Sequence, residues 1–332
     1  MAKKNERNIL FLDFHLKTKT TTPKLNGLPN NFELTELFEK LEIYREKKAV
    51  NIVVGNKEKK ELYLADIQHD TQSGTWQLLI NIVDTSLADE VHRQIGGAAS
   101  TRKVHSKTID VGTEFSCHMI IQDTLSGRSY LALYEQNPNL PIKLITRYLN
   151  ELFKSIAKEF KNEFEIPHPQ HKTDSKGKVK KINTYNHVFF NGHLSPKFKD
   201  DLNSGAFKGV TLMTGDLTQV NGYDVNKHSE LKEVQIPISV DKSAILKAGG
   251  NHKWLDKLRS NTAKDLSMQE IKVSFRDDND VSHTAEIDVN TGKLINDEKY
   301  VKKVKIIGFS EPLTTSVDLL HAPIVLKMLE HL

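Results

Sequence analysis

The chain lacks most of the features that identify a protein class at first sight. It has a single cysteine, Cys117, among 332 residues, so no disulfide can form within it, which fits a reducing compartment. No window approaches the ~20 consecutive apolar residues that span a bilayer. The early apolar run from Ile9 to Leu12 is interrupted by Asp13 and is too short for a signal-peptide core. We therefore expect a cytoplasmic protein.

Motifs that carry chemistry are also missing. The glycines Gly96 and Gly97 do not have the spacing of a phosphate-binding loop, and no helix-turn-helix, zinc finger or aromatic RNA-binding signature is visible. Among 14 histidines, His168 and His171 are close enough to share an ion, but no cysteine or carboxylate lies at ligand spacing. Cys117, followed by a histidine, would point to the opposite face of its strand. We expect no metal, no cofactor and no catalytic residue.

Composition bounds the architecture. A hydrophobic fraction of 38% and a charged fraction of 27% are typical of a folded, well-charged protein. A chain of this length usually exceeds one hydrophobic core, which favours two domains. The net charge of +4 is mildly basic, and its distribution matters more than its total.

Periodicity predicts an α+β fold with mainly antiparallel strands and flanking helices. A continuous apolar stripe predicts a helix from Pro141 to about Phe164, and a similar face predicts one over 32–47. Ser86 is a candidate cap for a short helix through Ile95. The remaining predictions for the first half are strands at 8–16, 50–54, 60–68, 75–83, 109–123 and 128–134.

The second half of the chain has the same mixture of elements. Strands are expected at 184–190, 230–240, 270–276, 282–289 and 301–309. Helices are expected to start at Ser195, to run over 242–266 with a break at two glycines, and to cover 316–332. Between the halves, the proline-bounded segment 166–183 is predicted to be a basic linker. The predicted domains are therefore 1–165 and 184–332.

Basic segments that lack acids are the most informative feature of the chain. No acidic residue lies between Arg93 and Asp110, and the linker carries five lysines against the single acid Asp174. Lysines and arginines on flexible segments can neutralise the phosphates of a duplex without exact geometry. We expect double-stranded DNA to be bound with low sequence specificity by three clusters: Arg93, Arg102, Lys103 and Lys107; Lys176, Lys178, Lys180 and Lys181; and Lys302, Lys303 and Lys305.

Two other interpretations stay open. A metal-dependent nuclease would need carboxylates and a lysine around a cation, which a hairpin could supply through Asp278, Glu286, Asp288 and Lys293. A protein-interaction module could use the C-terminal helix, although its apolar face is equally suited to the protein's own core. That face comprises Val317, Leu320, Ile324 and Leu326.

Three stretches resemble a known family. SELKEVQIPISVDKSAILKAGG is followed further along the second half by MQEIKVSFRDDNDVSHTAEIDVNTGKL, and the first half contains ELYLADIQHDTQSGTWQLLINIVDTSLADEVHRQI. The order of elements in them is similar to that of the RexA type of phage-exclusion protein, over about half of the chain. The resemblance implies a DNA-binding homodimer that senses phage infection and works with a membrane-protein partner. No residue role is transferred from the family, so the DNA contacts above come from charge alone.

Overall fold

The computed structural model describes residues 4–20, 28, 32–47, 51–54, 60–97, 101–126, 129–173, 175–204, 207–214, 234–239, 245, 249–265, 268–276, 282–295 and 298–332. Within these residues there are five helices and mostly antiparallel strands, so the predicted α+β class is confirmed. The chain forms two compact units. Unit 1 comprises Met1–Ile9, Phe14–Phe189 and Val304–Leu332, and unit 2 comprises Leu10–Asp13 and Phe190–Lys303. The segment 166–183 thus lies within unit 1.

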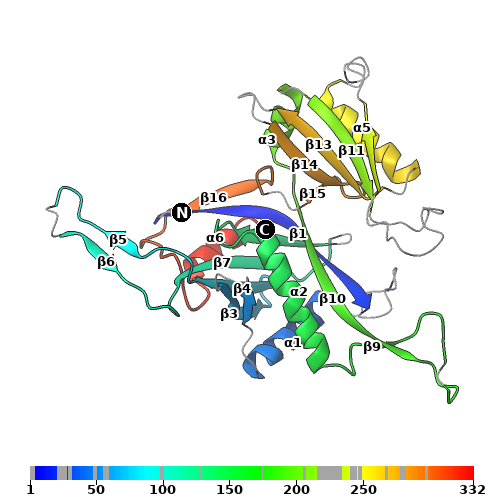
Figure 1. Cartoon of the computed structure of the whole chain (residues 1–332), viewed down its shortest axis with the longest axis horizontal. Coiled ribbons are helices and arrows are strands. Elements are labelled where there is room, and N and C mark those ends of the chain that lie inside the picture. Colours follow the sequence, from blue (N-terminus) through cyan, green and yellow to red (C-terminus); the bar gives the residue numbers. More distant parts are fainter. Residues whose placement is uncertain are drawn as a thin grey trace. The chain divides into compact units, whose positions relative to one another are not determined.

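Unit 1 is built on an antiparallel sheet (Figure 1). Its strands are β1 (Glu6–Thr20), β2 (Ile52–Val54), β3 (Lys60–Asp70), β4 (Thr75–Asp84), β7 (Thr113–Gln122), β8 (Tyr130–Glu135), β9 (Glu165–Pro167), β10 (Lys181–Gly192) and β16 (Lys303–Ile307). They follow the order β10–β1–β8–β7–β4–β3–β2, with β9 beside β10 and β16 beside β1. Residues 10–13 of β1 and 190–192 of β10 belong to unit 2.

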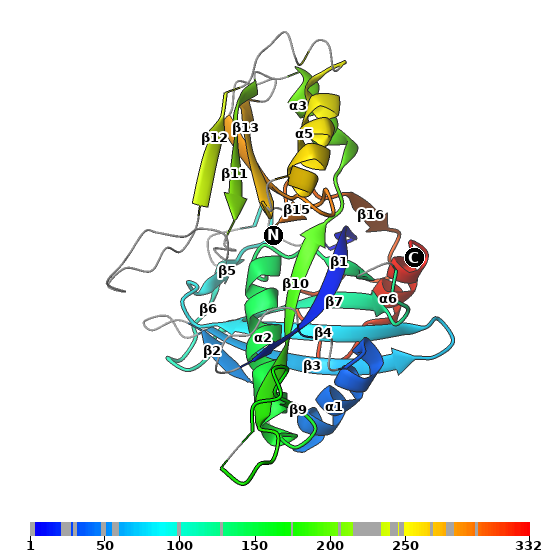
Figure 2. The ribbon, with the colours of Figure 1, turned by 90° about the vertical axis from the view of Figure 1, so that its right-hand side faces the viewer.

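One face of this sheet packs against two helices, α1 (Leu34–Lys47) and α2 (Ile142–Glu159), which Figure 2 shows beside the strands. Their apolar stripes bury aromatic side chains against the sheet. Phe38 of α1 lies edge-on to Trp76 of β4, with ring centroids 5.4 Å apart, and also contacts Phe153 of α2 at 6.1 Å. The predicted helices at 32–47 and after Pro141 are confirmed, and they cover the core of unit 1, although the second ends at Glu159 and not near Phe164.

The opposite face of the sheet is covered by the end of the chain. We call residues 313–321 the C-terminal strap. Helix α6 (Ala322–Leu329) follows it, so the helix predicted over 316–332 is wrong in its first part. The strap's backbone is bonded to side chains of the sheet instead of to a helical turn, and Pro323 fixes the start of α6. Ile324 is buried in the core, whereas Leu326 is exposed.

The helix predicted from Ser86 to Ile95 is also wrong. This segment contains β5 (Glu90–His92), which pairs with β6 (Lys103–His105) in a separate two-stranded sheet. Ser86 binds the carboxylate of Asp84 in a turn instead of capping a helix. The i, i+4 spacing of Val91 and Ile95 resembles a helical face, but neither side chain is buried.

Unit 2 is a smaller α+β unit. Its strands are β11 (Phe207–Thr214), β12 (Val234–Ile238), β13 (Glu270–Arg276), β14 (Ser282–Asp288) and β15 (Leu294–Ile295), in the order β12–β11–β13–β14–β15. Its helices are α3 (Pro196–Ser204) and α5 (Asn251–Asp265). Phe198, Phe275 and Tyr300 form an aromatic cluster with centroids 5.4–5.9 Å apart. Of the predicted elements here, residues 230–233, 240–244, 246–248 and 266–267 lie outside the described part of the chain.

A buried side chain of α2 is hydrogen-bonded to the backbone of strand β10. Asn150 is buried, and its amide donates to the carbonyl oxygen of Val188 (2.9 Å) and accepts the Val188 N–H (2.8 Å). The amide therefore bonds to both backbone groups of one strand residue, as a neighbouring strand would.

We predict that Asn150→Ala lowers the free energy of unfolding by about 2–4 kcal/mol, because the buried N–H and carbonyl of Val188 lose their partners. Urea unfolding followed by circular dichroism would measure it. Ser155→Ala, at a half-buried position of the same helix where the hydroxyl bonds to the Glu151 carbonyl, is the control and should change stability by less than about 0.5 kcal/mol. Equal effects of the two changes would contradict the role assigned to Asn150.

Candidate nucleic-acid interface

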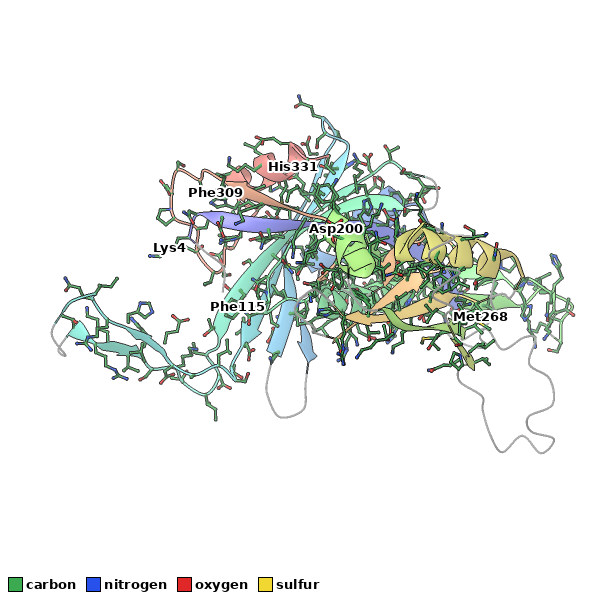
Figure 3. All side chains as sticks on the ribbon, turned by 90° about the horizontal axis from the view of Figure 1, so that it is seen from above. Lys4, Phe115, Asp200, Met268, Phe309 and His331 are labelled. Carbon is green, nitrogen blue, oxygen red and sulfur yellow. The ribbon has the colours of Figure 1, made fainter. Side chains whose placement is uncertain are left out.

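The first basic cluster lies on the β5–β6 ribbon, which we define as residues 85–112. Every residue of both strands is exposed, and the registered pairs are Glu90 with His105, Val91 with Val104, and His92 with Lys103. Figures 1 and 3 show the ribbon extending away from the sheet of unit 1, with side chains on both sides of it. Arg93, Arg102 and Lys103 are exposed on it, and Lys107 lies nearer its root.

The root of the ribbon continues the two central strands of unit 1. The chain leaves β4 at Asp84 and returns to β7 at Thr113, and these two residues are a registered pair. Gly112 is required here because a Cβ atom at this position would lie 2.6 Å from the backbone of Asp84. Lys107 closes the root, since its ammonium donates to the Ala88 carbonyl (3.2 Å). The ribbon is therefore mounted on two inner strands of the sheet, β4 and β7.

The second basic cluster also lies on a hairpin of unit 1. Strand β9 pairs with the start of β10, and beyond it the Lys180 N–H donates to the Lys172 carbonyl (2.7 Å), while Thr173 bridges to Val179. We call residues 165–183 the lysine hairpin. The predicted linker segment thus has backbone pairing of its own. All five of its lysines are exposed: Lys172, Lys176, Lys178, Lys180 and Lys181.

The third cluster is divided between the units and contacts other side chains. In unit 2, the Lys302 ammonium lies 4.0 Å from the ring centroid of Phe11. In unit 1, Lys305 pairs with Glu6 at 3.4 Å. Lys303 is exposed at the last position of unit 2. These three residues therefore do not lie together on one element of one unit, whereas each of the first two clusters does.

The hairpin considered for nuclease chemistry has structural partners at each described position. Glu286 pairs across the strands with Lys272 at 3.6 Å, and the Asp288 carboxylate accepts the Thr291 N–H (2.7 Å) in the following turn. The Lys293 ammonium binds the buried carboxylate of Asp13. Asp278 lies outside the described residues. Among the residues that the structure describes, no group of three or more His, Cys, Asp or Glu side chains could hold a metal ion.

The structure also describes the histidines and the cysteine that were considered as metal ligands. His168 is buried, and its Nδ1 accepts the N–H of Gln170 (3.2 Å), while His171 is exposed. Cys117 is buried opposite Ile80 of β4, and His118 is opposite Leu79, so the prediction that they face opposite sides of the sheet is confirmed. In the described part of the chain, no helix is both long enough and apolar enough to span a bilayer.

A buried ionic network, which the sequence pattern does not reveal, lies under the C-terminal strap. The Glu135 carboxylate of β8 accepts hydrogen bonds from the Arg7 Nε (2.7 Å) and from His118 Nδ1 (2.6 Å). His118 Nε2 in turn accepts the N–H of His321 (3.1 Å), and the Arg7 guanidinium donates to the Thr314 carbonyl (2.8 Å). A cavity of about 260 Å³ adjoins these residues.

This network holds the strap and does not expose a reactive group. Both nitrogens of His118 are already bonded, so its proton on Nδ1 goes to Glu135 and its Nε2 lone pair goes to the backbone. Burial of the Glu135 carboxyl would raise its pKa, but the hydrogen bond from His118 and the charge of Arg7 outweigh burial and lower the pKa below the ordinary value of 4.5.

Comparison with known proteins gives no further information about the function of this chain. No protein-family model, no curated protein and no solved structure was found to match this chain.

We predict a pH-dependent loss of stability in Glu135→Gln. The folded-state pKa of Glu135 is lowered, so the ionised carboxylate stabilises the fold above about pH 4.5, and this contribution is lost as the pH falls through the folded pKa. The variant should be less stable than the original by about 3–5 kcal/mol at pH 7, since Arg7 loses its buried counter-charge. This difference should shrink as the pH falls below about 4.5.

Urea unfolding at several pH values between 7 and 3 checks this expectation. Glu151→Gln is the matched control, because Glu151 forms an exposed pair with Lys154 (2.7 Å) that contributes little. A stability difference between Glu135→Gln and the original chain that does not vary with pH would contradict the prediction.

Proposed function

We propose that the protein binds double-stranded DNA with low sequence specificity through the β5–β6 ribbon, assisted by the lysine hairpin. The observation that carries this proposal is that Arg93, Arg102 and Lys103 stand on a fully exposed two-stranded ribbon that extends from the sheet. Two-stranded β-ribbons bind DNA in the major or in the minor groove, and arginines and lysines on such a ribbon can bind phosphates on either side of a groove.

The charge of the ribbon supports a polyanion as its partner. No acidic residue interrupts the sequence between Arg93 and Asp110. The three acids of the ribbon, Asp89, Glu90 and Asp110, lie at or before the start of β5 or after β6, away from the loop between the strands. Low sequence specificity follows from the residue types, because phosphate contacts position a protein on DNA without reading its bases.

The lysine hairpin supplies a second basic surface on the same unit. Its lysines are spread over about ten positions, with Lys181 paired at 3.9 Å with Glu165 at the base of the hairpin. Both projections belong to unit 1, so one folded unit carries both charged surfaces. The homodimer, the phage-exclusion setting and the membrane-protein partner rest on the family resemblance alone and stay predictions.

We predict that replacing Arg93, Arg102 and Lys103 together by alanine lowers the affinity for duplexes of any sequence about equally. The slope of log K against log salt should become shallower by about 0.9 for each lost phosphate contact. Fluorescence anisotropy with a short labelled duplex, measured across a salt series, gives both quantities.

The matched control removes the same number of charges from α2, by alanine at Lys143, Arg147 and Lys158, which are exposed. It should leave affinity and slope close to those of the original chain. Equal losses in the two triple variants would show that only net charge matters, and the ribbon would not be the contact surface.

For the lysine hairpin, we predict that glutamate at Lys178, Lys180 and Lys181 lowers affinity without sequence preference and flattens the salt dependence. The same anisotropy series measures both effects. Unchanged affinity together with an unchanged slope would remove this hairpin from the interface and leave the ribbon as the single contact surface.

A further inference from the structure

The loop that joins the two strands of the ribbon holds an apolar side chain at its corner. The Gly97 N–H donates to the Gln94 carbonyl (3.1 Å), which closes a β-turn, and Gly96 has a φ of +71° in its third position. Ile95 therefore occupies the second position, the projecting corner of the turn. Its side chain is 101% exposed, as in an extended chain.

This turn has a defined conformation. The Arg93 guanidinium donates to the Gly97 carbonyl (3.0 Å), which ties the start of the turn to its end. A Cβ atom on Gly97 would lie 2.8 Å from the Thr101 hydroxyl, so a larger residue would require the Thr101 side chain to move. Two glycines and one arginine thus hold Ile95 outward, whereas single exposed apolar residues elsewhere on a surface need no special explanation.

The charges around Ile95 determine which partner it would meet. Arg93 precedes it by two positions, Lys103 begins the returning strand, and Arg102 lies directly before that strand. Phosphates attracted by these cations would bring base pairs close to the corner of the turn. Proteins that bind the minor groove insert apolar side chains, isoleucine among them, between neighbouring base pairs and kink the duplex by 20–90° toward the major groove.

We infer that Ile95 is a wedge that inserts between adjacent base pairs and bends the DNA to which the ribbon binds. This inference rests on the proposed function and adds to it that the bound DNA is bent. The apolar side chain leaves water for the space between two base pairs, and the flanking cations hold the phosphates on either side. The cost of unstacking one base step, a few kcal/mol, is offset by the wider contact that a bent duplex makes with the protein.

The test uses the full-length chain and a duplex of about 30 base pairs with a donor dye at one end and an acceptor at the other. The original protein at saturation should raise energy transfer between the dyes. In Ile95→Ser, this increase should fall by about half or more, because the wedge is lost. Its affinity should change less than about tenfold, since phosphate contacts dominate binding.

Ile109→Ser is the matched control, because Ile109 is the same residue type, is 90% exposed and lies outside the loop between β5 and β6. It should bend the duplex as the original does. Binding without bending, or equal bending by the original and Ile95→Ser, would overturn the wedge and leave the proposed function standing. Absence of duplex binding by the original chain at low salt would overturn both.

The same exposed isoleucine among cations could also enter an anionic lipid surface. Co-sedimentation with phosphatidylglycerol vesicles measures this in parallel. Vesicle binding that Ile95→Ser abolishes, combined with DNA bending that it leaves unchanged, would assign the corner to a membrane surface and overturn the inference.

Discussion

The buried carboxylate of Glu135 is the interaction on which unit 1 depends. It joins Arg7 of β1, His118 of β7 and, through that imidazole, the backbone of the C-terminal strap. A carboxylate without such partners would be costly inside a protein, whereas here both oxygens of the Glu135 carboxylate accept hydrogen bonds. The network therefore fixes which strands are neighbours and where the strap lies on the sheet.

The buried network and the strap also support the base of the ribbon. It leaves the sheet from β4 and returns to β7, the strand that carries His118. The strap crosses the same strands, where Asn81 of β4 donates to the Val317 carbonyl (3.0 Å) and the Ser116 hydroxyl of β7 accepts the Val317 N–H (2.9 Å). Both strands are therefore held at the face opposite the helices, and an exposed projection gains a rigid base.

Periodicity was sufficient to predict the long elements, because α1, α2 and the central strands bury continuous apolar faces. It failed at Ser86–Ile95 and at the start of the C-terminal helix, where pairing and side-chain bonds decide the conformation. The basic residues of the ribbon were found from charge alone, but their placement on two paired strands was not. Ile95 was missed because an isolated isoleucine beside two glycines has no pattern, and only the turn geometry distinguishes it.

The strap also has a consequence for synthesis on the ribosome. Arg7 and Thr314, which share a hydrogen bond, are 307 positions apart, and the whole of unit 2 is encoded between them. All of unit 2 must therefore be synthesised before the C-terminal strap can cover the sheet of unit 1. Chains whose synthesis stops before the strap would expose apolar side chains of β4 and β7 to chaperones and proteases. The ribbon would therefore have a rigid base only in chains that contain the strap.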